Sequence, residues 1–208
     1  MDTPANEGIP PTSQVWPPVE KGQSVPGAGP FGMVLFLVSL TVSFLAVLVA
    51  YAVFRVRGGS EWLPADKTGL PDLLWVSNGL IVGCSGAAQW ALIAVRNDRR
   101  THLLVALVST LLLALGFTVC QGFAWREIAR EQHLEGMRIY SVTFYLLTGL
   151  HALHVIGGFG LQAWVVVRAS LRHYWSLFHP GVLYAAMYWH FLGAVWFVLF
   201  AVLWSGSQ

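Results

Sequence analysis

Charged residues are absent from five long segments of this chain, and that absence constrains the fold more than any other feature. The segments are residues 31–54, 73–95, 103–125, 139–167 and 182–204. Each holds at least 23 residues without Asp, Glu, Lys or Arg, and an α-helix needs about 20 apolar residues to cross a bilayer core. Membrane-spanning strands need only about 10 residues and alternate apolar with polar side chains, which these segments do not. The sequence therefore predicts an all-α integral membrane bundle of five transmembrane helices.

The composition excludes several functional classes. Charged residues make up 11% of the 208 residues, and the mean hydropathy is +0.61, whereas about a quarter of an ordinary soluble domain is charged. A net charge of +2 is too small to indicate a nucleic-acid partner. The two cysteines, Cys84 and Cys120, are too few for a disulfide scaffold or a zinc site. These numbers exclude a disordered chain, a nucleic-acid binder and a typical cytosolic enzyme.

The remaining residues predict a tail and short connections. Residues 1–30 hold seven of the ten prolines, which favours an extended, flexible tail, and residues 31–206 are left as one transmembrane domain. Beyond residue 125, Arg and Glu recur at helical spacing, so we expect the third helix to continue into water. Lys and Arg number six on each side of the membrane. Three arginines crowded into residues 96–102 favour an N-terminus inside and a C-terminus outside.

Three histidines lie deep within the predicted helices and call for an explanation, because ionisable side chains are costly in a bilayer. They are His151, His154 and His190. A b-type haem would take His190 and one of the other two as axial ligands. A proton path would pair histidine with a carboxylate, which the five segments lack. The simplest interpretation is a set of hydrogen bonds to Thr148, Tyr188, the backbone or lipid.

Small and aromatic residues predict close packing of the helices. Gly79 and Gly83 form a G-x-x-x-G pair, a spacing that is common where transmembrane helices approach one another. Trp189 and Trp196 lie in mid-helix and are seven residues apart, so they share a face that suits packing on another subunit or on a lipid chain. From the residues alone, we predict a five-helix membrane protein with a polar histidine seam.

Two segments near the C-terminus carry longer motifs. Residues 144–158, FYLLTGLHALHVIGG, resemble the F-x-x-L-T-G-x-H-x-x-H-V-x-x-G segment of subunit III of the haem-copper oxidases. Residues 188–196, YWHFLGAVW, resemble the last-helix motif of that family, Y-W-H-F-V-D-x-V-W. Gly116, Gln121 and Trp125 are similar to its G-x-x-x-x-Q-x-x-x-[YW] stretch. The order and spacing of these motifs match the family.

The resemblance implies a role in a larger complex. It suggests a five-helix subunit III in a bacterial inner membrane, within an oxidase that reduces oxygen to water and translocates protons. Such a subunit is not catalytic, carries no cofactor itself, packs against subunits I and II, which hold haem and copper, and binds phospholipids. A larger respiratory supercomplex is a further expected partner. The residues implicated in lipid binding, helix packing or subunit contact are Gln121, Trp125, Thr148, Gly149, His151, His154, Tyr188, Trp189, His190 and Trp196.

Three positions depart from the family pattern. Acidic residues of relatives are replaced here by Leu40, Leu183 and Gly193. Without these carboxylates, we expect the histidines to contact one another, backbone carbonyls, lipid or water, because buried polar groups need partners. Two alternatives stay open at this point: a partner of another haem-copper enzyme such as nitric oxide reductase, and a bis-histidine membrane cytochrome.

Overall fold

Five long helices account for nearly all of the structure. The computed structural model describes residues 28–58, 73–135 and 139–206. The helices are α1 (Ala28–Gly58), α2 (Leu73–Arg96), α3 (Arg100–Glu135), α4 (Ile139–Ser170) and α5 (Pro180–Gly206). Every charge-free segment lies within one of them, and all five are long and apolar enough to cross a membrane. The predicted all-α bundle of five transmembrane helices is confirmed.

Two sequence predictions concern the ends of these helices. The third helix continues to Glu135, as the spacing of Arg and Glu after residue 125 indicates. The predicted tail lies outside the described residues, except that residues 28–30 form the start of α1. Pro30 fits there because proline is tolerated in the first turn of a helix, where its missing N–H has no partner to lose.

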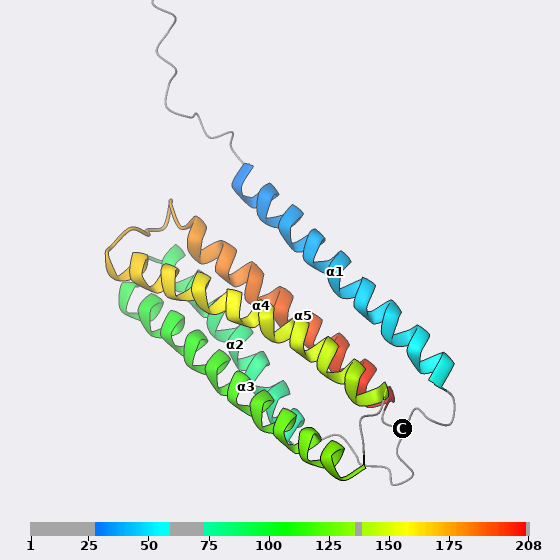
Figure 1. Ribbon diagram of the computed structural model, residues 1–208. Coiled ribbons are helices and arrows are strands. Elements are labelled where there is room, and N and C mark those ends of the chain that lie inside the picture. Colours follow the sequence, from blue (N-terminus) through cyan, green and yellow to red (C-terminus); the bar gives the residue numbers. More distant parts are fainter. Residues whose placement is uncertain (1–27, 59–72, 136–138, 207–208) are drawn as a thin grey trace, which may run out of the picture.

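The helices form a four-membered bundle with a fifth helix along its side (Figure 1). The α2–α3 pair is joined by a tight turn, α3 contacts α4, α4 contacts α5, and α5 contacts α2. The first helix packs on α4 and α5 and lies on the side away from α2 and α3 (Figure 1). It therefore presents most of its circumference to whatever surrounds the subunit.

The α2–α3 turn and the start of the α4–α5 loop are both tight turns, and they lie at the same end of the bundle. Asp98, between α2 and α3, has a φ of 52°, and Arg172, after α4, has a φ of 62°. A residue in this left-handed region commonly ends a helix by turning the chain back on the last carbonyls. The carboxylate of Asp98 also accepts a hydrogen bond from the backbone N–H of Ser176, at 2.8 Å. The two loops are thereby fixed to each other.

Glycines allow close approach at only some of the predicted positions. A Cβ atom on Gly83 would lie 3.5 Å from Leu113 of α3, whereas one on Gly79 would meet nothing within 4 Å. Among the glycines of α4, Gly158 has the closest neighbours. A Cβ atom there would lie 3.0 Å from Tyr188 and 3.3 Å from Trp189, both on α5. The G-x-x-x-G pair therefore contributes one packing glycine to the α2–α3 contact.

Candidate functional site

The motif residues of α3 and α4 meet in a polar contact, which we call the α3–α4 seam (Gln121, Trp125, Tyr145, Thr148 and His151). The indole N–H of Trp125 donates to the hydroxyl of Thr148 at 3.1 Å, and the hydroxyl of Tyr145 donates to the carbonyl of Trp125 at 3.0 Å. Thr148 in turn donates to the carbonyl of Phe144 at 2.7 Å. Specific hydrogen bonds thus join α3 to α4.

His151 and Gln121 lie one turn further along the seam and are almost completely buried. His151 is 1% exposed and Gln121 is 7% exposed. The imidazole is surrounded by the rings of Trp196, Phe117 and Phe44, with ring centroids 5.4, 5.9 and 6.2 Å away. Among the described residues, neither polar side chain has a hydrogen-bond partner. This enclosure leaves little room for a ligand beside the ring.

The aromatic residues of α5 bind its neighbours through their N–H and O–H groups. Trp189 donates to the side-chain oxygen of Gln162 at 3.0 Å, and Tyr188 donates to the carbonyl of His154 at 2.8 Å. Trp196 donates to the side-chain oxygen of Asn78 at 2.9 Å. These three donors reach α2 and α4, so the last-helix motif joins α5 to both of these helices by hydrogen bonds.

Three amide side chains complete this network, and their partners were not predicted from the sequence. Gln162 of α4 accepts from Trp189 and donates to the carbonyl of Leu107 at 2.9 Å, which links α4 to α3. Asn78 accepts from Trp196, and Gln89 contacts a histidine, as described next. The sequence did contain a clue to these contacts. An uncharged amide in an apolar segment needs a hydrogen-bond partner inside the membrane.

The other two histidines have partners of their own. The Nδ1 atom of His154 lies 2.7 Å from the carbonyl oxygen of Leu150, which is one of the contacts expected for it. The Nε2 atom of His190 lies 3.3 Å from the side-chain oxygen of Gln89 on α2, a partner that was not expected. Because each imidazole is engaged or enclosed separately, the arrangement does not favour a haem held between two helices.

The three positions at which the resemblance implies an acidic residue lie in contacts between helices. A Cβ atom on buried Gly193 would lie 3.0 Å from the hydroxyl of Ser85 on α2, so α2 occupies the space of a longer side chain. Leu40 and Leu183 are half-buried and pack against hydrophobic clusters. Leu40 and Leu183 therefore make apolar contacts within the subunit, and Gly193 allows α2 to approach α5.

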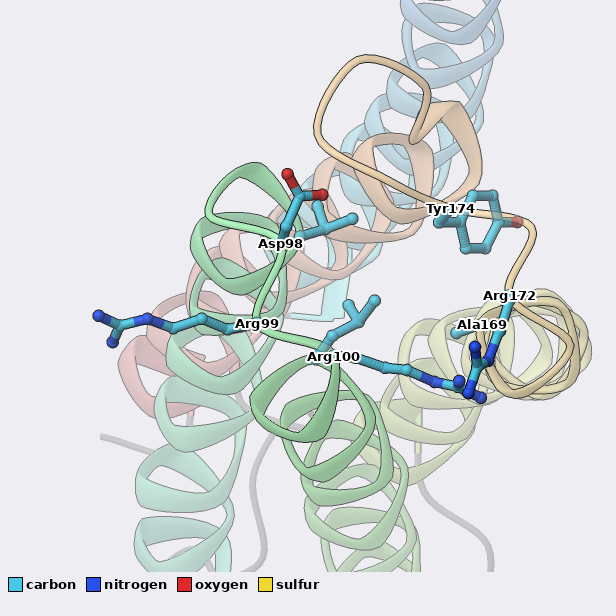
Figure 2. A pocket seen from close by; sticks show the side chains of 8 residues that line it. Asp98, Arg99, Arg100, Ala169, Arg172 and Tyr174 are labelled. Atoms are coloured by element: carbon cyan, nitrogen blue, oxygen red, sulfur yellow. The ribbon is translucent and has the colours of Figure 1, made fainter.

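A basic pocket of about 290 Å³ lies where the α2–α3 turn meets the α4–α5 loop. Figure 2 shows Arg100 and Arg172 pointing toward one another, while Arg99 points away from them. Arg100 also donates to the carbonyl of Ser170 at 2.7 Å. Tyr174 lines the same pocket, and burial raises its pKa despite the opposing charge of Arg168. Two converging guanidinium groups favour an anionic ligand.

An apolar groove of about 180 Å³ lies between α1 and α5. Phe44 and Leu48 of α1 form one wall, and Phe191, Val195 and Leu199 of α5 form the other. Apart from Thr41, its lining is aliphatic and aromatic, so it can hold a hydrocarbon chain.

Comparison with known proteins identifies the family. The family model described as cytochrome c oxidase subunit III matches residues 20–207. The chain is 37% identical over 189 residues to cytochrome c oxidase subunit 3 of Marchantia polymorpha, covering 86% of this chain and 69% of the relative. It is 34% identical to that of Polypterus ornatipinnis and 32% identical to that of Homo sapiens, each over 198 residues, 92% of this chain and 72% of the relative. The chain therefore belongs to the cytochrome c oxidase subunit III family.

Proposed function

We propose that this chain is the non-catalytic subunit III of a respiratory terminal oxidase and packs against its subunits I and II. The observation that carries the proposal is the family match over residues 20–207. The two motif segments, residues 144–158 and 188–196, also lie in the adjacent helices α4 and α5. The haem and copper of the complex would reside in subunits I and II, where oxygen is reduced and protons are moved. Relatives of similar sequence carry the name cytochrome c oxidase subunit 3.

We further propose that the subunit holds phospholipid on its surface. The apolar groove between α1 and α5 suits an acyl chain, because Phe44, Val195 and Leu199 line it with hydrocarbon. The basic pocket at the end of the bundle suits the phosphate of an anionic headgroup, because Arg100 and Arg172 converge there (Figure 2). Bidentate guanidinium contacts are well suited to phosphate.

The same pocket supports an orientation in the membrane. The α2–α3 turn and the α4–α5 loop are short and have arginines in or beside them: Arg96, Arg99 and Arg100 at the first and Arg172 in the second. Short loops rich in Lys and Arg remain on the cytoplasmic side of a membrane. We therefore place this end, with the N-terminus, inside a bacterial inner membrane and the C-terminus outside.

Affinity purification of the tagged chain from its own membrane tests the assignment. The expected result is co-purification of haem-copper oxidase subunits I and II in a constant ratio, identified by mass spectrometry. Purification of the chain with no haem-copper subunit would overturn the proposal. Phospholipid retained by the same material is expected to fall in an Arg100→Gln, Arg172→Gln double variant. An Arg99→Gln variant is the control, because that side chain points away from those of Arg100 and Arg172 (Figure 2).

A further inference from the structure

A small cavity interrupts the packing of the α3–α4 seam, next to the hydrogen bond between Trp125 and Thr148. Gln121 and His151 line it together with Thr118 and Thr148. The centre of a water molecule can occupy about 20 Å³ there, and a buried water needs about 10–15 Å³ by the same measure. The cavity therefore has room for one water molecule.

The polar groups that line this cavity are those left without partners. Among the described residues, the amide nitrogen and oxygen of Gln121 and both ring nitrogens of His151 form no hydrogen bond. Both side chains are more than nine-tenths buried, so bulk water does not reach them. Unpaired polar groups are costly in a protein interior, and Gln162, the other buried glutamine of the bundle, is paired at both ends.

We propose that the cavity is a binding site for one structural water molecule, which bridges the imidazole of His151 and the amide of Gln121. A buried water makes about three hydrogen bonds, and the lining residues supply them. A neutral imidazole offers one donor and one acceptor, and an amide offers both kinds of group. The hydroxyls of Thr118 and Thr148 donate to carbonyls of their own helices. Thr148 also accepts from the indole of Trp125, so one of its lone pairs is used, and its second lone pair and those of Thr118 can accept a bond from the water.

The position of the water explains how the seam continues along the two helices. Gln121 precedes Trp125 by four residues on α3, and His151 follows Thr148 by three residues on α4. Residues three and four apart lie on the same face of a helix. The Trp125–Thr148 pair is joined by a direct bond, whereas the next pair is joined through the water. A hydrogen bond through a bridging water is nearly as favourable in enthalpy as a direct one. The water therefore links α3 to α4 across the cavity.

Aromatic rings pack around His151 and limit the space beside its imidazole. Trp196 and Phe117 pack against the imidazole, and the two rings pack edge to face at 5.0 Å from each other. These contacts hold the ring plane of His151 and close the cavity on the side of α5. The site depends on residues of one chain, so it does not require that the chain be part of an oxidase.

Cryo-electron microscopy of the full chain, purified with whatever subunits it carries, tests the proposal. At a resolution that shows ordered waters elsewhere in the subunit, we expect one peak about 2.7–3.2 Å from a His151 nitrogen and the Gln121 amide. A cavity with no peak in such a map would contradict the proposal. So would a direct bond between Gln121 and His151, or a peak of several atoms.

A matched pair of variants separates the water from general packing. The His151→Phe variant removes both ring nitrogens, so the peak is expected to disappear. The His154→Phe variant makes the same change three residues away, where the imidazole already pairs with Leu150, and the peak is expected to remain. If His151→Phe does not fold, Gln121→Met removes the other half of the bridge with a side chain of similar size. A peak that persists unchanged in that variant would overturn the assignment.

Discussion

The helix with the most apolar 18-residue stretch in this subunit is the one that the rest of the chain buries least. In the most apolar 18-residue stretch of α1 the mean hydropathy is 2.7, and the chain itself buries 6% of the residues. The corresponding stretch of α5 has a mean hydropathy of 1.8, and 50% of its residues are buried. The apolar surface of α1 is therefore left for lipid or a partner, whereas polar and aromatic groups of α5 mark where it meets other helices of this chain.

The two helices are also attached differently. Tyr188, Trp189 and Trp196 of α5 each donate to a group on α2 or α4, so α5 is bonded along its length. The first helix is instead bonded to α5 near its C-terminal end, where Tyr51 donates to the carbonyl of Val202 and Arg55 donates to Ser205. Apolar surfaces gain little by meeting each other inside a lipid bilayer, which explains why directed bonds decide the packing.

The largest expected effect is the loss of Trp196 from α5. This side chain is 1% exposed, packs on Phe117 and His151, and bonds to Asn78. Trp196→Ala is expected to lower the free energy of unfolding by about 3–5 kcal/mol, as for large core truncations. Phe197→Ala, at the neighbouring 43% exposed position, is the matched control and should have little effect. Chemical unfolding in detergent measures both, and equal losses would refute the contrast.

The next effect concerns the close approach of α2 and α5 at Gly193. Gly193→Leu places a branched side chain where a Cβ alone would already lie 3.0 Å from Ser85. We expect a loss of about 1–3 kcal/mol, typical of overpacking. Gly79→Leu is the control, because a Cβ there meets nothing within 4 Å. Thermal unfolding of the two variants measures the difference. If Gly79→Leu is destabilised as much as Gly193→Leu, the close contact at Gly193 does not matter for stability.

A smaller effect is expected when a single bond of α5 is removed and the ring is kept. Trp189→Phe deletes the donor that pairs with Gln162. Interhelical hydrogen bonds in membranes are worth about 0.6 kcal/mol on average and up to about 1.7, so a loss in this range is predicted. Trp75→Phe, at a 55% exposed position on α2, provides the comparison in the same unfolding assay. A neutral Trp189→Phe variant would mean that shape alone fixes α5.

The smallest effect is expected on the outer face of α1. Val42 is 61% exposed, so Val42→Ala should change the unfolding free energy of the isolated chain by no more than about 0.5 kcal/mol. The matched substitution Val155→Ala on α4, where the side chain is 1% exposed, should cost more, because it opens space in the core. If both variants lose the same stability, α1 is buried more than the structure indicates.

The sequence predicted the elements better than their contacts. Charge-free segments identify helices because every charge in a bilayer core is costly, and this holds whatever the helices touch. The motifs likewise brought Trp125 and Thr148 to attention, and these residues do meet. The partners Asn78, Gln89 and Gln162 were missed because pairing depends on the rotation of one helix against another. The sequence of a single helix does not carry that rotation, and the same limit hid the difference between Gly79 and Gly83.

Separating the purified complex into this chain and its remaining subunits tests the central assignment most directly. The visible absorption of each fraction is then recorded, together with its haem content. We expect a Soret band with the haem-copper subunits and none with this chain, because His151, His154 and His190 are occupied by packing and hydrogen bonds. A Soret band that follows this chain, and that His190→Phe abolishes, would show that the chain itself binds haem.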